Sequence, residues 1–266
     1  TRPYARLGPM NADTPPAATR HLRLADLPKE HLAGDGNWLW KIPFDGGFGV
    51  LKVYTGNRHP LLHVKKTFGN TVLTGRTSHM PRARRAYEVD CVDLWARHGF
   101  GVFGMHPEVV FDDLPPGTYM LYDFTEGEPF REFFRDESIT LEERLATWRR
   151  FLPEWHRRHA LAVELGEPRL IHENGDCKHV LVMDGGRFVS FDFEIGFRSR
   201  DLRDLVGREV LAYLRSFGRK LALTLMDETV AHYGACGLCV VECEGTPKLL
   251  RSCSTLAADG MVIDTE

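Results

Sequence analysis

Hydrophobic and polar residues alternate along the first half of the chain. "NWLWKIPFD" and "FGVLKVY" alternate on either side of Gly46-Gly47, which predicts a β-hairpin. "VFGMHPEVVFDD" and "GTYMLYDFTEG" alternate around Pro115-Pro116-Gly117 and predict a second strand pair. Between the two, a basic, glycine-containing connection leads into "RARRAYEVDCVDLWARHG", where the apolar spacing predicts a helix that stops at Gly99.

The second half changes to helical spacing. "TLEERLATWRRFLPEWHRRHAL" is amphipathic and begins with Thr140 and Glu143, a capping box. Residues 170–194, "LIHENGDCKHVLVMDGGRFVSFDFE", predict an apolar strand, a polar loop, a second strand, a Gly-Gly turn and a third strand that ends on Asp192. Residues 200–234 again have helical spacing. Strands followed by helices predict the α+β class.

Composition places the chain among ordinary globular proteins. Its 266 residues suffice for one large domain or two small ones, and a net charge of -3 gives no general attraction to nucleic acid or to a membrane. The chain contains no run of about 20 apolar residues, so the sequence predicts no membrane span. Residues 1–21 lack the apolar core of a signal peptide, so we interpret them as a disordered leader and expect a cytoplasmic protein.

Two stretches concentrate arginine. Residues 78–85, "SHMPRARR", hold three arginines, and residues 148–159, "WRRFLPEWHRRH", hold four. Both stretches could be solvated helix faces, and both could be surfaces that face an anion. The sequence leaves the two interpretations open.

Lys52 is the first candidate for chemistry. It lies inside the apolar strand "VLKVY", where a buried ammonium needs a carboxylate partner, and Glu88 on the following helix is the natural candidate. The alternative is an edge-strand lysine that points to solvent. Phosphoryl transfer needs a cation on the nucleotide phosphates, a metal held by carboxylate or amide, and a group that orients the acceptor hydroxyl.

The polar loop of residues 172–179 supplies candidates for the metal ligand and for the group that orients the acceptor hydroxyl. It crowds His172, Asn174, Asp176 and His179 into eight positions, and Asp192 closes the hairpin that follows. A polar turn whose side chains cap strands is the structural alternative for each residue taken singly.

The order of these features resembles the protein-kinase-like fold, over residues 25–230. Its nearest likeness is to the bacterial lipopolysaccharide (Kdo/heptose) kinases, on "VLKVY", the Glu88 helix, "YMLYDF", "LIHENGDCKHVLV" and "FVSFDFE". The resemblance implies a bilobal α+β fold with a strand-rich N-lobe (22–122) and a helical C-lobe (123–232). It implies that ATP and Mg²⁺ bind between the lobes and that the acceptor is a sugar hydroxyl of the lipopolysaccharide inner core, free or lipid-linked.

The resemblance also assigns roles to the cofactor-binding residues. Lys52 would hold the α- and β-phosphates, Glu88 would orient Lys52, and Asp192 and His179 would face Mg²⁺. The glycines Gly34 and Gly36 of "AGDGN" stand where such kinases have a phosphate-covering loop.

One position departs from the family pattern. Asn174 stands where these kinases have the acceptor-orienting Asp. An amide can hold a hydroxyl but cannot take its proton, although a loose transition state asks little of a base. Asp176 could reach the same space. The chain is therefore an active kinase or a catalytically silent nucleotide-binding module. The arginine clusters would suit an anionic lipopolysaccharide headgroup, with peripheral contact to the inner membrane surface.

The tail, residues 233–266, is cysteine-rich. Cys236, Cys239 and Cys253 have a thiolate spacing suited to iron–sulfur or zinc. "CGLCVVE", "PKLLRSC" and "ADGMV" resemble the [2Fe–2S] ferredoxin-like domain of complex I large subunits, whose first ligand would lie about a dozen residues before Cys236. This chain has "LMDETVAH" there. Three interpretations stay open: Cys243 is a fourth cluster ligand, the thiolates bind Zn²⁺ with His232, or the tail is a partial domain without metal. An iron–sulfur electron-transfer fragment is accordingly the alternative function.

Overall fold

The computed structural model describes residues 18–33, 36–56, 59–173 and 175–216, and the backbone of three short strands further on. The chain divides into two compact units. The first runs to Glu126 and includes Phe193–Ile195, and the second comprises Gly127–Asp192 and the chain from Gly196. The first unit is rich in strands and the second in helices, so the predicted α+β class is confirmed.

The first unit is built on an antiparallel sheet with the order β2-β3-β4-β6. Its strands are β2 (Glu30–Ala33), β3 (Trp38–Phe44), β4 (Gly47–Val53) and β6 (Tyr119–Asp123). The predicted β3–β4 hairpin is confirmed, with its turn at Asp45 (φ 48°) and Gly46 (φ 75°). Positive φ at both central residues is the turn geometry that matches the twist of a tight hairpin.

The second predicted strand pair is confirmed only as one antiparallel bridge, between Met105 and Tyr122. β5 (Val109–Phe111) does not pair with β6 but runs parallel to β1 (Arg20–Leu22), whereas β6 pairs with β4. A side-chain contact links β5 to β6 instead, since the Phe111 N–H donates to the Tyr119 hydroxyl at 2.9 Å. β1 begins at Arg20, within the range predicted as a leader.

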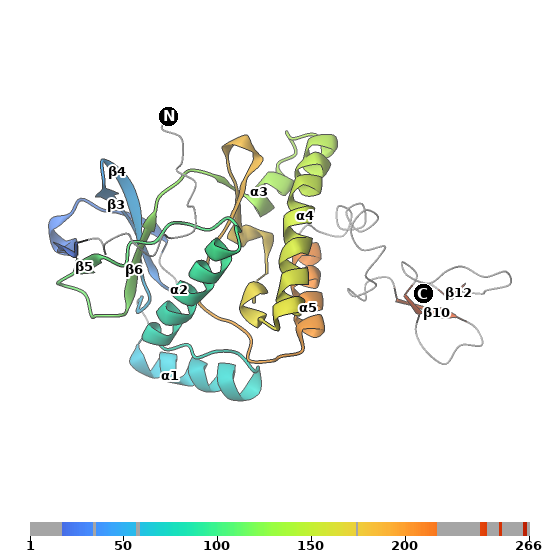
Figure 1. The fold of residues 1–266 in the computed structure, drawn as a ribbon, viewed down its shortest axis with the longest axis horizontal. Coiled ribbons are helices and arrows are strands. Elements are labelled where there is room, and N and C mark those ends of the chain that lie inside the picture. The colour runs from blue at the N-terminus through green and yellow to red at the C-terminus, as the bar shows by residue number, and fades with distance from the viewer. Residues whose placement is uncertain are drawn as a thin grey trace. The chain divides into compact units, whose positions relative to one another are not determined.

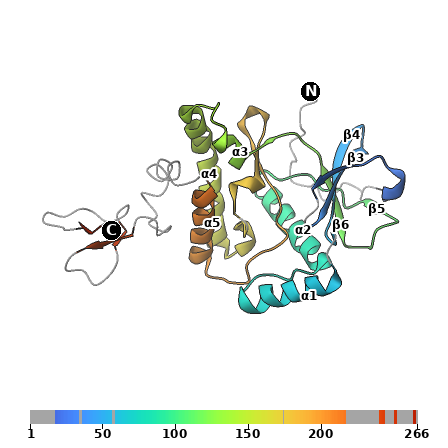
Figure 2. The same ribbon diagram turned by 180° about the vertical axis from the view of Figure 1, so that it is seen from behind.

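The helices of the first unit are α1 (Pro60–Phe68) and α2 (Pro81–Arg97). The prediction of α2 is confirmed, and Gly99 follows it with a φ of 72°. α1 lies where only a connection was expected. Pro60 starts it and His59 caps its N-terminus, and a π-helical turn, Gly69–Leu73, continues it. Figures 1 and 2 show α2 beside the sheet and α1 below α2.

The two faces of the sheet carry different neighbours. Leu51 and Val53 join an apolar cluster with Ile42 and Phe111 on one side. Successive side chains of a strand point to opposite faces, so Lys52 between them points to the other side. There Met120, its register partner, packs with Tyr54, and Val89 of α2 covers them. The alternation of β4 therefore aims the ammonium at α2.

The second unit packs helices around an aromatic core. Its helices are α3 (Phe130–Arg135), α4 (Leu141–Leu165) and α5 (Leu202–Ser216), and its strands are β7 (Glu128–Pro129), β8 (Val180–Val182) and β9 (Phe188–Ser190). The capping prediction is confirmed, because the Thr140 hydroxyl accepts from the Glu143 N–H at 3.2 Å. Phe130, Trp148 and Phe151 fill the core. α4 and α5 lie side by side in both views (Figures 1 and 2).

The hairpin of residues 170–194 differs from its prediction at the start. The expected first strand is a 3-10 turn, Pro168–Leu170, opened by Pro168. Its Leu170 carbonyl accepts from the Arg158 guanidinium, so this backbone is satisfied by a side chain. β8 and β9 pair as predicted, with the Asp184–Gly186 turn between them, but β9 ends at Ser190 and not on Asp192.

Beyond α5 the structure describes β10 (Val240–Cys243), paired antiparallel with β11 (Leu250–Arg251) and β12 (Ile263–Asp264). Within the described part of the chain, no helix has the length and apolar content to cross a bilayer.

Candidate functional site

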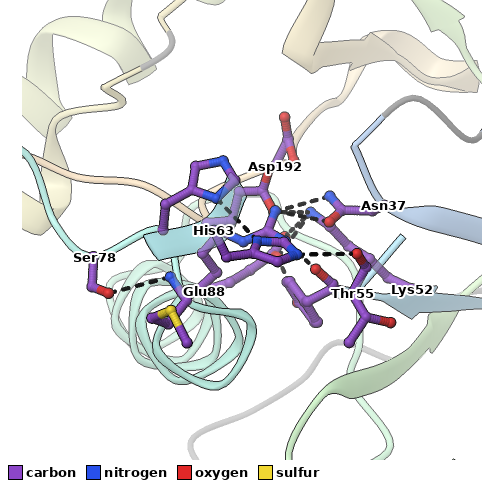
Figure 3. Close-up of polar contacts among 12 residues, drawn as sticks. Asn37, Lys52, Thr55, His63, Ser78, Glu88 and Asp192 are labelled. Carbon is purple, nitrogen blue, oxygen red and sulfur yellow. Dashed lines mark hydrogen bonds and ion pairs between the residues drawn. The ribbon is translucent and has the colours of Figure 1, made fainter. Parts of the chain in front are cut away.

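Lys52 and Glu88 form a buried ion pair. Lys52 Nζ lies 2.9 Å from Glu88 Oε2 and 3.1 Å from Oε1, and the side chains are only 7% and 4% exposed. The sequence predicted this pairing, and the structure brings the two side chains together from β4 and α2 (Figure 3). Replacing such a buried pair with apolar residues is often neutral or stabilising, so the pair needs a reason other than stability.

A pair of tyrosines supports Glu88. The Tyr54 hydroxyl donates to Glu88 Oε2 at 2.5 Å and lies 3.0 Å from the Tyr122 hydroxyl. Burial, followed by the neighbouring Glu88 carboxylate, raises the pKa of Tyr54 well above its usual value. Tyr54 therefore stays protonated and donates, which fixes the carboxylate that holds Lys52.

Glu194 adds a second carboxylate to this group of side chains. Its Oε2 accepts from Arg84 Nη1 at 2.8 Å and from Asn37 Nδ2 at 2.9 Å, and lies 3.9 Å from Lys52 Nζ. Arg84 is fully buried and also donates to the Tyr54 carbonyl and to Asn37 Oδ1. We call these residues the Lys52 cluster: Asn37, Lys52, Tyr54, Arg84, Glu88 and Glu194.

The second unit holds Asp192 and His179. His179 Nε2 lies 3.3 Å from Asp192 Oδ2. Asp192 has a φ of 69°, a left-handed conformation that costs energy for a residue other than glycine. Such strained residues cluster at active sites and ligand-binding sites, where the surrounding structure holds them in place. Asp192 is thus presented in a fixed, unusual orientation beside an imidazole.

Glu209 of α5 anchors the loop that precedes His179. Its carboxylate accepts from the Trp155 indole at 3.1 Å, from His159 Nε2 at 3.1 Å and from the His172 backbone N–H at 3.0 Å. The Arg158 guanidinium pairs with both of its oxygens. Burial alone would raise the pKa of Glu209, but Arg158 and the other donors outweigh it and hold that pKa far below its usual value.

Gly175 lets the loop approach α5. A Cβ at this position would overlap Glu209 Cγ and crowd the His172 carbonyl, so only glycine fits here. His172, at the start of the loop, points its Nε2 at the Phe191 carbonyl, 2.9 Å away. Burial, and then the nearby His179, lower the pKa of His172 to about 4, so it is neutral at pH 7.

Asp176 is engaged within the loop. Its Oδ1 accepts from the Lys178 N–H at 3.0 Å and from the Ser216 hydroxyl at 2.8 Å, and Arg131 lies 3.6 Å from its Oδ2. Burial raises the pKa of Asp176, but these donors outweigh it and the net shift is downward. The contacts describe a carboxylate that holds the 3-10 turn Cys177–His179, and a role in orienting an acceptor stays a prediction.

Several predicted residues lie outside the described part of the chain. They are Gly34, Asn174, and the side chains of Cys236, Cys239, Cys243 and Cys253. Gly36 is described, and its carbonyl lies so close to Gly56 that a Cβ there would come within 2.7 Å of it. Among the residues that the structure does describe, no group of three metal-ligating side chains converges.

The arginine clusters are partly structural. Arg84 is buried in the Lys52 cluster, Arg85 Nε donates to the Tyr119 carbonyl at 2.7 Å, and Arg158 is buried against Glu209. Arg84 and Arg158 are neither solvated faces nor anion-facing surfaces, so both sequence interpretations are wrong for these two, whereas Arg85 is half-buried. Arg82 and Arg157 are exposed.

Comparison with known proteins gives two partial likenesses. Residues 200–266 match the family model of the 2Fe-2S iron-sulfur cluster binding domain. This match begins before the predicted tail and includes α5. No curated protein matches the chain.

The solved structures include two of a Rio2 kinase from Chaetomium thermophilum. The ADP/Mg²⁺-phosphoaspartate complex is 15% identical with a TM-score of 0.45, over 73% of this chain and 56% of that one. The second structure is also 15% identical, with a TM-score of 0.43, over 73% of this chain and 57% of that one. This chain therefore spans less than two thirds of the Rio2 chains.

Proposed function

We propose that this chain is a phosphotransferase that binds ATP with Mg²⁺ and phosphorylates a sugar hydroxyl. The observation that carries the proposal is the buried Lys52–Glu88 pair. An ammonium in the middle of a sheet, held by a carboxylate that is itself held by Tyr54, is a preorganised cation for nucleotide phosphates. The kinase-like sequence resemblance supports the same role.

Asp192 and His179 are the proposed metal site. One carboxylate, completed by waters and phosphate oxygens, is a donor set that Mg²⁺ accepts, whereas imidazole suits other cations better. Asp192 would therefore hold the ion, and His179 would hold Asp192 or complete the ligand set. When bound, the ion would neutralise charge on the phosphates. Asn174 would hold the acceptor hydroxyl by hydrogen bond.

The acceptor is proposed to be a sugar of the lipopolysaccharide inner core. This step rests on the sequence resemblance and on "HENGDCKH", in which His172 and His179 occupy both ends of the proposed catalytic loop. A catalytically silent, nucleotide-binding module is the alternative within this class.

Thermal unfolding with ATP tests the proposal. ATP with Mg²⁺ at about 100 times its Kd is expected to raise the Tm by about 5 °C or more, and ATP with EDTA by much less. Asp192→Asn removes the charge yet tolerates left-handed φ, so it should fold and lose the Mg²⁺-dependent part of the shift. Asp184→Asn, at an exposed site in the same hairpin, is the matched control and should keep the full shift. No Mg²⁺-dependent stabilisation of the unmodified chain would refute nucleotide binding.

We propose a [2Fe–2S] cluster as a second candidate function, on the family match of residues 200–266. Such clusters are held by four thiolates, and four cysteines lie in this range at positions 236, 239, 243 and 253. The donor set fits in number and kind. Freshly purified protein is expected to be brown, with visible charge-transfer bands and about two irons per chain, and Cys236→Ser/Cys239→Ser should be colourless. A colourless chain that contains zinc would favour the Zn²⁺ interpretation instead.

A further inference from the structure

α1 and the π-helical turn after it expose an unusual number of large apolar side chains. Leu61 is 70% exposed, Phe68 61% and Leu73 76%. The full set lies within thirteen residues and comprises Leu61, Leu62, Val64, Phe68, Val72 and Leu73. A large exposed apolar patch on a soluble protein marks an interaction site for a protein, a membrane or a ligand.

These residues form a stripe on the outer side of the helix. Leu61, Val64, Phe68 and Val72 follow one another at helical spacing. The opposite side is polar and packed inward. His63 is buried with its Nε2 3.3 Å from the Thr55 carbonyl (Figure 3), and the Thr67 hydroxyl accepts from the His79 N–H at 3.0 Å. This is the reverse of an ordinary surface helix, whose apolar side faces the core.

The charge around the stripe has one sign. Residues 55–83 contain five lysines and arginines and no aspartate or glutamate, in a chain whose net charge is -3. Lys65 and Lys66 are exposed beside Val64 and Phe68 on α1 itself, and Arg82 is exposed at the start of α2. An apolar stripe flanked by lysines and free of acidic residues complements a surface with anionic groups on the outside and an apolar interior beneath them.

We propose that α1 and its π-helical turn form a docking surface for an anionic lipid bilayer. Leu61, Val64, Phe68 and Val72 would enter the boundary between headgroups and acyl chains, and Lys65 and Lys66 would contact lipid phosphates. The segment of residues 60–73 is far too short to cross a bilayer, so it would lie in the interface plane. This inference is independent of the proposed function, because it uses no residue of the Lys52 cluster or of the metal site.

Vesicle sedimentation with the full chain tests it. Vesicles of phosphatidylglycerol and phosphatidylcholine should bind the protein, and vesicles of phosphatidylcholine alone should bind it much less. Lys65→Gln/Lys66→Gln is expected to lower the partition coefficient about 30-fold. Val64→Ser/Phe68→Ser should lower it at least about tenfold. Raising the salt concentration should weaken the binding of the unmodified chain.

The matched control is Val163→Ser/Leu165→Ser, which removes two apolar side chains of α4 that are 49% and 51% exposed. It should bind vesicles like the unmodified chain, and all variants should keep the unmodified Tm. Equal loss in the control and the α1 variants would overturn the proposal, as would equal binding to both kinds of vesicle. A dimer in solution that Val64→Ser/Phe68→Ser dissociates, with no vesicle binding, would assign the stripe to a second copy of the chain instead.

Discussion

Replacing Glu209 with glutamine is expected to lower the free energy of unfolding of the second unit by about 3–5 kcal/mol. The carboxylate receives hydrogen bonds from Trp155, Arg158, His159 and the His172 N–H, and the variant leaves the buried Arg158 charge uncompensated. The amide also brings donors of its own into a site that is already full of donors. Urea unfolding followed by tryptophan fluorescence measures the loss.

Two further variants distinguish the contribution of the buried Arg158–Glu209 pair from a general effect of substitution in α5. Asp204→Asn, on the same helix, breaks an exposed pair with Arg208 at 2.8 Å and should cost at most about 0.5 kcal/mol. Arg158→Met/Glu209→Leu removes both buried charges and should recover part of the stability that Glu209→Gln loses, since the Trp155 indole and the His172 N–H still lack their acceptor. Equal losses for Glu209→Gln and Asp204→Asn would show that Glu209 does not anchor the loop.

Sequence reasoning found the Lys52–Glu88 pair because the pattern itself contains a conflict. A lysine in a strand of alternating burial either faces solvent or needs a carboxylate partner. The predicted helix that follows supplies Glu88 as a candidate partner. The same helix holds Arg84, four residues before Glu88, and Cys91 and Trp95 follow on that face. Two of the six buried residues of α2 are thus charged, and the weak amphipathicity of the helix is a sign of that.

Glu209 was missed because its partners are remote. Trp155, Arg158 and His172 lie 37 to 54 positions away in sequence, so no local pattern joins them. A signal does exist. Glu209 stands four residues after Leu205 and four before Tyr213, both buried, and therefore on the apolar stripe of α5. A charged residue on such a stripe predicts a buried partner of opposite charge.

The connection between β4 and α2 was misjudged for the opposite reason. Sequence analysis expects a helix to turn its apolar side toward the core, and α1 turns it outward. The pairing of β5 with β1 could not be read from local alternation either, because parallel pairing joins residues about 90 positions apart. Tertiary contacts, not the local pattern, determine the orientation of α1 and the pairing partner of β5.

Lys52→Met is expected to lower the affinity for Mg-ATP about 100-fold. The variant removes the ammonium that would donate to the phosphates, and a hydrogen bond to a charged group contributes about 1.5–3 kcal/mol. It also leaves Glu88 buried without its cation and should cost about 3 kcal/mol of folding stability. Isothermal titration with ATP and Mg²⁺ gives the first quantity and urea unfolding the second.

The two effects can be separated by removing both charges. Lys52→Met/Glu88→Leu eliminates the uncompensated carboxylate and should regain most of the lost stability, yet it should bind Mg-ATP as poorly as Lys52→Met. Lys41→Met, the same substitution on the neighbouring strand β3, removes an ammonium that lies over the rings of Phe48 and Phe124 and should leave nucleotide affinity unchanged. If the double variant regains affinity together with stability, Lys52 acts on the fold alone, and the buried pair gives no support to phosphate binding.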